Sequence, residues 1–308
     1  MTVAVAGGTG FVGGSIAAEL LRRGEHVVVL SHRPARARDR LTEAIEVRTA
    51  DANGDPAVLD AALAGVDALV IALAFPNAPM EDPTRGWTYE RVDAGGTEAL
   101  VAAARRAGVG RLVYISGAGA AERAERHWFR AKWRAEQAVQ SSGIQYTIIR
   151  PTWIYGPRDV SLNRFLGFAR WLPFVPLTGS GSQLLAPVFV DDVARLAADS
   201  LTDAAAANQT FELGGPQTYT MRQIVTIALQ VAGKRRLILP APASLLRLAA
   251  RVLQHLPGRL LTPDGVDFVN QPATVDVAPL LAAMPRRLTP LEEGLATYLT
   301  AGKRSTRV

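Results

Sequence analysis

The chain has 308 residues, 48% of them hydrophobic, enough for one large α/β domain or a domain with a smaller second lobe. It has no cysteine, which excludes disulfides and thiolate chemistry, and its four histidines lack metal-ligand spacing, so we predict no metal. The net charge is +6, but acids and bases are interspersed without an aromatic–basic repeat, which argues against nucleic-acid binding. No apolar run reaches transmembrane length and no signal peptide precedes the first strand, so we expect a cytoplasmic protein.

The first predicted element is a short apolar strand, 3–6, that leads directly into glycines spaced three apart. Gly7 permits a sharp reversal, Gly10 lets a pyrophosphate approach the backbone, and Gly13 lets the following helix pack closely. The start of that helix offers free N–H groups and the positive end of its dipole to phosphates. We therefore predict a dinucleotide-binding turn, with contacts from Gly7, Thr9, Gly10, Phe11, Val12 and Gly13.

Basic residues follow the second predicted strand, 26–30, where an NAD-selective protein would place an acid on the ribose hydroxyl. A hydroxyl, an imidazole and a guanidinium stand there instead, at Ser31, His32 and Arg33. The planar fork of arginine matches phosphate oxygens, so this segment favours NADP(H) over NAD(H), with a solvated basic loop as the alternative. A third strand is predicted over 43–49, and Asp51 after it is placed to contact the adenine.

Strands and helices continue to alternate downstream. We predict helices over 56–63 and 87–107, strands over 67–73 and 111–115, and a proline-rich loop over 75–86. Small residues at the end of the fourth strand would let a cofactor cross the sheet edge at Ala72, Leu73 and Ala74. This order predicts an α/β Rossmann fold, with a doubly wound parallel sheet and ligands at the carboxyl ends of its strands.

Several motifs together resemble the extended and atypical short-chain dehydrogenase/reductase superfamily, also called NAD(P)-dependent epimerase/dehydratase-like. They are the glycine turn and the segments 92–97, 112–117, 150–157, 187–194 and 211–216. The segment from 239 to 295 is most similar to bacterial relatives of the NAD(P)H-binding accessory subunit of respiratory complex I. The resemblance implies a Rossmann domain over 1–155, completed by segments near 184–215, and a smaller, mostly helical C-terminal lobe over 156–308. It also implies catalytic positions at Ser116 and Lys132, with Lys132 and Pro151 contacting the cofactor.

One motif departs from the superfamily's pattern. Active members carry Tyr-x-x-x-Lys on a helix, where the lysine lowers the tyrosine pKa and the phenol transfers a proton. This chain has Lys132, but Trp128 stands four residues earlier, and an indole does not exchange protons near neutral pH. His127 titrates in the useful range but points about 100° away around the helix. Tyr155 could reach the site, although ring packing beneath a turn is its simpler role.

Three interpretations of this gap stay open. Another group moves the proton, or Lys132 itself donates it, or no chemistry occurs and the cofactor is a structural or sensing ligand. We favour an oxidoreductase acting on an apolar small molecule. The alternative is a non-catalytic NAD(P)H-binding subunit, assembly factor or redox sensor.

The C-terminal part contributes apolar and amphipathic segments. An aromatic-rich set could form a hydrophobic substrate pocket or a core: Phe165, Phe168, Trp171, Leu172, Phe174 and Val175. We interpret Asp191 and Asp192 as a helix N-cap pair. A basic amphipathic helix is predicted from Ala243 to Leu256, which would cover a core or contact a membrane surface or protein partner.

Overall fold

A seven-stranded parallel sheet forms the centre of the computed structural model, which describes residues 1–39, 41–76, 78–253 and 262–300. The strand order is β11-β6-β5-β4-β1-β2-β3, and every neighbouring pair is parallel. The strands are β1 (Thr2–Ala6), β2 (His26–Ser31), β3 (Glu46–Thr49), β4 (Ala68–Ile71), β5 (Arg111–Ile115), β6 (Gln145–Pro151) and β11 (Gln209–Leu213). The order reverses direction on either side of β1, which is the arrangement of a Rossmann fold.

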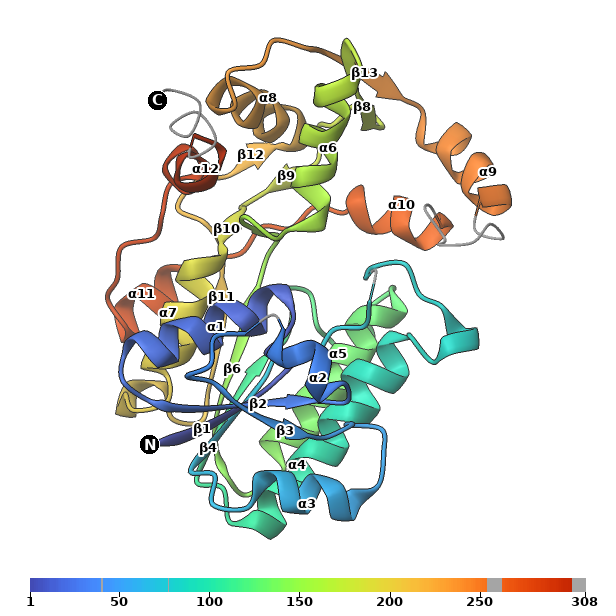
Figure 1. The fold of residues 1–308 in the computed structure, drawn as a ribbon. Helices are drawn as coiled ribbons and strands as arrows, with labels where there is room; N and C mark the ends of the chain where they lie inside the picture. The colour runs from blue at the N-terminus through green and yellow to red at the C-terminus, as the bar shows by residue number, and fades with distance from the viewer. Residues whose placement is uncertain (40, 77, 254–261, 301–308) are drawn as a thin grey trace.

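Helices cover both faces of the sheet (Figure 1). Alternate residues of β1 enter different cores: Val3 and Val5 pack on one face, and Ala4 and Ala6 on the other. The first face is covered by α1 (Phe11–Arg22), α7 (Val190–Asp199) and α11 (Ala278–Ala283), and the second by α3 (Pro56–Leu63), α4 (Gly96–Ala107) and α5 (His127–Gln140). The predicted doubly wound α/β fold is confirmed, because both faces of a parallel sheet are buried.

The predicted helix over 87–107 is wrong in its first part. A π-helical segment, η2 (Tyr89–Gly95), precedes α4, and the Thr88 hydroxyl accepts the Arg91 N–H at its start. The wide turns of this segment carry Asp93 to a buried partner on α5, a tertiary contact that periodicity alone does not reveal. The third and fourth strands are shorter than predicted, whereas α3 has the predicted bounds.

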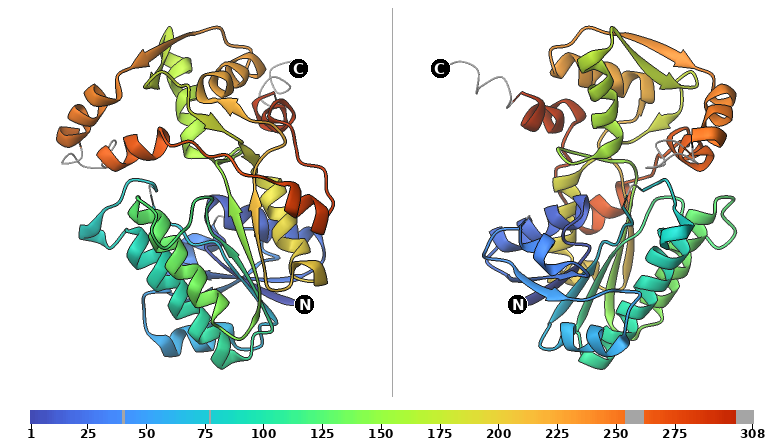
Figure 2. Two further views of the ribbon diagram at one scale, coloured as in Figure 1. Left: turned by 180° about the vertical axis from the view of Figure 1, so that it is seen from behind. Right: turned by 45° about the vertical axis from the view of Figure 1, so that its right-hand side comes forward.

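A second lobe lies over the carboxyl ends of the strands (Figures 1 and 2). Phe11, the first residue of α1, packs into this lobe and lies against Gly156. The lobe contains α6 (Val160–Trp171), α8 (Met221–Val231), α9 (Ala243–Leu253), α10 (Pro263–Val269) and α12 (Leu291–Leu299). Its small sheets pair β7 (Ile154–Tyr155) with β10 (Val188–Phe189), β9 (Leu184–Leu185) with β12 (Tyr219–Thr220), and β8 (Phe174–Thr178) with β13 (Leu237–Ala241).

Short helices occupy the remaining connections: α2 (Pro34–Arg38), η1 (Pro83–Arg85) and η3 (Ala204–Ala206). Within the described ranges, no helix is long and apolar enough to cross a membrane. The predicted amphipathic helix from Ala243 corresponds to α9; positions 254–256 of that prediction lie outside the described residues.

Candidate dinucleotide-binding site

The glycine turn brings β1 against β4 more closely than a side chain would allow. Gly7 has a φ of +84°, and a Cβ there would lie 2.2 Å from the carbonyl oxygen of Ala72. A Cβ on Gly13 would lie 2.3 Å from the carbonyl oxygen of Gly7. Among the residues that the structure describes, no side chain caps α1 at Gly10, so the first N–H groups of the helix are available to an anion. This geometry fits the pyrophosphate of a dinucleotide.

The other predicted residues of this turn contact the second lobe and the segment that follows β7. Phe11 and Val12 pack into the core of the second lobe, and the Thr9 carbonyl accepts a 2.9 Å hydrogen bond from Arg158. The exposed Arg158 guanidinium also lies beside Gly14, so it places a cation on the glycine turn. Sequence reasoning missed Arg158, because 149 positions separate it from Thr9 and only the fold brings the two together.

The predicted adenosine contacts gather at the ends of β2 and β3, which are neighbouring strands. Ser31 is buried, and its hydroxyl accepts the Arg33 N–H at 3.1 Å, so it shapes the turn. His32 and Arg33 are exposed just before α2. Asp51 is also exposed and accepts the Asn53 N–H at 2.9 Å. The fold therefore brings these predicted residues to one end of the sheet.

The remaining predicted contacts follow β4 and end β6. Ala72 and Leu73 are half-buried and Ala74 is exposed, directly beyond the last residue of β4. Pro151 is the buried last residue of β6, and its carbonyl accepts the Ala118 N–H at 2.9 Å. The strand ends there as predicted, since proline cannot donate to the next ladder bond.

One face of α5 carries Trp128, Lys132 and Glu136, which are spaced four residues apart. The Lys132 ammonium lies 2.5 Å from a carboxylate oxygen of Asp93 and donates to the Ile115 carbonyl at 3.3 Å. Its side chain is only 15% exposed and that of Asp93 3%. A buried ion pair therefore stands at the carboxyl end of β5.

Burial and the attraction between the two charges have opposite effects on the pKa of each residue of this pair. Burial favours the neutral amine of Lys132, but attraction to Asp93 and Tyr114 outweighs this and raises its pKa. Burial is the largest effect on Asp93 and raises the pKa of its carboxyl, although Lys132 opposes the shift. Among the described residues, the second Asp93 oxygen and the Tyr114 hydroxyl have no hydrogen-bond partner. Lys132 is therefore held as a cation beside Asp93.

The Ser116 hydroxyl is already engaged. It is 5% exposed and donates a 2.5 Å hydrogen bond to Glu136, which is fully buried. Arg150 donates two further bonds to the same carboxylate, at 2.9 and 2.6 Å. Ser116 thus belongs to a buried Ser116–Glu136–Arg150 network at the end of β5.

His127 has an acidic partner that the sequence did not reveal. Its Nε2 lies 2.7 Å from Glu81, and the other Glu81 oxygen accepts the Tyr89 N–H at 2.7 Å. The imidazole is 41% exposed and packs edge-on against Tyr89 and Trp128, at centroid distances of 6.2 and 5.2 Å. This arrangement holds a titratable ring in one orientation while leaving it open to solvent.

The second lobe contacts the same end of α5. Phe268 of α10 packs on Trp128 at 5.7 Å between ring centroids, and Asp267 accepts a 3.0 Å bond from Arg126. Trp128 is buried, so the residue in the tyrosine position of the superfamily's motif is part of a hydrophobic cluster.

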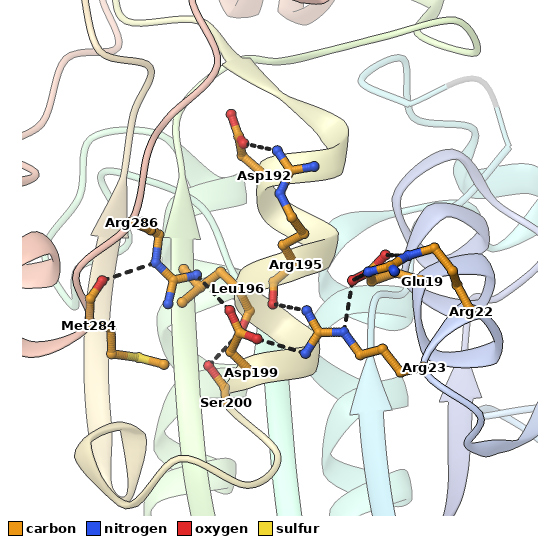
Figure 3. Close-up of polar contacts among 10 residues, drawn as sticks. All are labelled: Glu19, Arg22, Arg23, Asp192, Arg195, Leu196, Asp199, Ser200, Met284 and Arg286. Carbon is orange, nitrogen blue, oxygen red and sulfur yellow. Dashed lines mark hydrogen bonds and ion pairs between the residues drawn. The ribbon is translucent and has the colours of Figure 1, made fainter.

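The predicted N-cap pair at the start of α7 is wrong. Asp191 and Asp192 do not cap α7, because the helix begins at Val190; Asp192 instead bonds Arg195 and accepts the Thr289 N–H at 2.8 Å. Figure 3 shows how Asp199, on the same helix, accepts from Arg23 at 2.6 Å and from Arg286 at 3.3 Å. These contacts join α1, α7 and the segment after α11, and so stabilise the fold.

Tyr155 is fully buried, and its hydroxyl lies beside the start of α12. It therefore has the packing role that the sequence suggested as the simpler one. The aromatic set after it is divided: Val175 is buried and Phe165 packs against the same core, as the core alternative predicts, whereas Phe168, Trp171 and Leu172 are exposed. These three side chains neither line an enclosed pocket nor fill a core.

The fold and the uncapped glycine turn define a Rossmann-type dinucleotide-binding protein. A family model described as NAD(P)H-binding matches residues 7–167, just over half of the chain. The chain therefore belongs to this NAD(P)H-binding family. Among described residues, no group of histidine and acidic side chains could hold a metal ion.

Its relatives include reductases and respiratory subunits. A (4-alkanoyl-5-oxo-2,5-dihydrofuran-3-yl)methyl phosphate reductase of Streptomyces griseus is 31% identical, covering 75% of this chain and 74% of that protein. Ceramide reductase of Caulobacter vibrioides is 30% identical, covering 79% and 75%. The mitochondrial 40 kDa subunit of NADH-ubiquinone oxidoreductase of Neurospora crassa is 33% identical over 56% of this chain; the match spans only 44% of the subunit. The predicted resemblance to atypical reductases and complex I subunits is confirmed.

Solved structures have a similar fold. The NADPH-dependent quinone oxidoreductase of Escherichia coli, complexed with NADPH, has a TM-score of 0.72 and 23% identity, covering 96% of this chain and 99% of that one. At this identity the likeness concerns the fold alone.

Proposed function

We propose that this protein is an NADP(H)-dependent reductase that acts on an apolar carbonyl compound. The observation that carries the proposal is the buried Lys132–Asp93 pair at the carboxyl end of β5. Two charges removed from water gain little net stability, so a pair at the ligand-binding edge of the sheet points to a role in binding or chemistry. The reductase activities in the names of two relatives support the reaction class.

The residues present fit a phosphorylated dinucleotide. The first turn of α1 and Arg158 would hold the pyrophosphate, and Arg33 with His32 would meet a 2′-phosphate at the end of β2. Lys132 would bind the ribose next to the reacting ring, as the superfamily's pattern implies. When bound, NADPH supplies the hydride for the carbonyl carbon.

We assign the proton to His127. Its imidazolium would donate the Nδ1 proton to the carbonyl oxygen as the hydride arrives, while Nε2 keeps its bond to Glu81, which would stabilise the charged ring and fix its orientation. Because the ring is partly exposed, solvent can return the proton. Lys132, with its raised pKa, contributes positive charge and no proton. Ser116 would act as a positioning residue, since its own proton is donated to Glu136.

The test compares two histidines that both face a glutamate. The His127→Asn variant should keep its affinity for NADPH and lose about a hundredfold in kcat toward medium-chain alkyl aldehydes and ketones, followed by NADPH absorbance. His26 lies 3.2 Å from Glu46 on the far end of β2, so His26→Asn is the matched control and should retain full activity. Unchanged kcat in His127→Asn would remove His127 from the mechanism.

A second candidate function is a non-catalytic NAD(P)H-binding subunit. The specific observation in its favour is that Trp128 is buried in an aromatic cluster while Lys132 and Ser116 have internal partners. The respiratory-subunit relatives are consistent with this candidate. Release of bound NADPH distinguishes the two: slow release without turnover on any carbonyl supports the subunit, whereas fast release with turnover supports the reductase.

A further inference from the structure

An apolar patch lies at the end of the second lobe, where α6 meets β13. We define the apical patch as Phe168, Trp171, Leu172, Leu237 and Leu239, all of which are exposed. Trp171 is 84% and Leu237 70% exposed, which is unusual for two large apolar side chains.

Two hydrogen bonds bring the parts of the patch together. Arg236 donates to the Ala169 carbonyl at 3.1 Å, and the Leu237 N–H donates to the Pro173 carbonyl at 3.4 Å. In the β8–β13 ladder, Leu237 lies opposite Phe174 and Leu239 opposite Pro176, so these residues share the outer face of the small sheet. The exposed apolar side chains of the patch therefore come from two neighbouring elements, the end of α6 and β13.

The charges around the patch have one sign. Arg164, Arg170, Arg235 and Arg236 are exposed on the same elements or beside them. The sequence has no acidic residue between Asp159 and Asp191, nor between Glu212 and Asp264. An apolar patch with a tryptophan, on elements whose charged residues are all basic, is complementary to an anionic lipid surface, where indole rings prefer the headgroup region.

A second copy of the chain fits this surface poorly. In a two-fold dimer the patch would meet itself, and the arginines of both copies would face one another. The patch also lies at the end of the molecule opposite to α3 and the loops beneath the sheet, so contact with a flat surface leaves the nucleotide-binding edge uncovered (Figures 1 and 2).

We propose that the apical patch docks the protein on the surface of anionic membranes without spanning them. Trp171 and Leu237 enter the interfacial region, and the surrounding arginines bind lipid phosphates. This inference is independent of the proposed reaction, because it concerns another part of the lobe and is measured without substrate or cofactor.

The experiment is flotation of the full chain with vesicles of phosphatidylcholine alone or with phosphatidylglycerol added. We expect binding to the anionic vesicles, weakened by salt. Trp171→Glu should reduce it at least about tenfold, and Arg235→Glu about fivefold or more. Val58 is also an exposed apolar residue, on α3 at the opposite end, so Val58→Glu is the matched control and should bind like the unaltered chain.

Three results would overturn the proposal. They are no binding to anionic vesicles, equal binding by Trp171→Glu, or a dimer in sedimentation that Trp171→Glu converts to a monomer. Trp171 is largely exposed, so its variants should fold; Trp171→Ala, with an unchanged urea midpoint and weakened vesicle binding, confirms that the loss comes from the surface.

Discussion

Replacing the Lys132–Asp93 pair in a double-mutant cycle separates its contribution to stability from its role in the site. Lys132→Met leaves the buried Asp93 carboxylate without its cation, and Asp93→Leu leaves the buried ammonium without its anion. Breaking a buried pair on one side costs about 3–5 kcal/mol. The double variant places two apolar side chains of similar volume between η2 and α5. Its free energy of unfolding should lie within about 1 kcal/mol of that of the unaltered protein, or above it.

Urea unfolding at neutral pH measures the cycle. With a slope near 3 kcal/mol per molar, each single variant should lower the midpoint by about 1–2 M, and the double variant should restore it. NADPH titration and turnover on the same proteins should show that the double variant stays defective in both. Additive losses in the double variant would refute the claim that the pair is retained for function, because they would show that each charge stabilises the fold separately.

Three further predictions concern other parts of the molecule. Gly7→Ala should abolish NADPH binding and lower the free energy of unfolding by about 3 kcal/mol, since its Cβ would meet the Ala72 carbonyl at a positive φ. The control Gly167→Ala, in open space on α6, should leave the free energy of unfolding in urea unchanged or raise it by about 1 kcal/mol. Arg33→Ala should weaken NADPH about tenfold and leave NADH unchanged in fluorescence titrations, whereas Arg38→Ala should alter neither. Burial raises the pKa of Asp159 to about 6, so its folding contribution is full below about pH 4 and is lost as pH rises to 6. Both Asp159 oxygens accept N–H bonds at the start of α6, so Asp159→Asn should remove this pH dependence of the urea midpoint and lose about 1 kcal/mol at pH 4, because its amide keeps only one acceptor.

The sequence was sufficient for most of the sheet because local signals were consistent there. Buried strands such as β1 are continuous apolar runs. The start of α3 has a local signal as well, because Asp55 is its N-cap and the side chain accepts the Ala57 N–H. Gly7 and Gly13 were predicted correctly because the turn requires glycine where a Cβ would collide with a backbone carbonyl oxygen. Local chemistry thus predicted the nucleotide-binding turn.

The sequence pattern did not predict contacts between segments that are distant along the chain. Glu81 and His127 are 46 positions apart, and Arg158 is farther still from Thr9. The π-helical turns that present Asp93 have no periodicity signature, because a run such as 89–95 is compatible with an ordinary helix. The N-cap assigned to Asp192 failed for a similar reason: its partner, Thr289, comes from the C-terminal part of the chain.

The four-residue spacing on α5 explains why the site keeps its form without the superfamily's tyrosine. Trp128, Lys132 and Glu136 face the end of β5 together, and each has a different partner: an aromatic cluster, Asp93, and Ser116 with Arg150. The tryptophan fills the first position with apolar volume and so removes proton transfer from this face. In the proposed reductase the proton would then come from the neighbouring face, where His127 and Glu81 are hydrogen-bonded. If His127→Asn leaves turnover intact, this division between a cation-holding face and a proton-donating face of α5 is wrong.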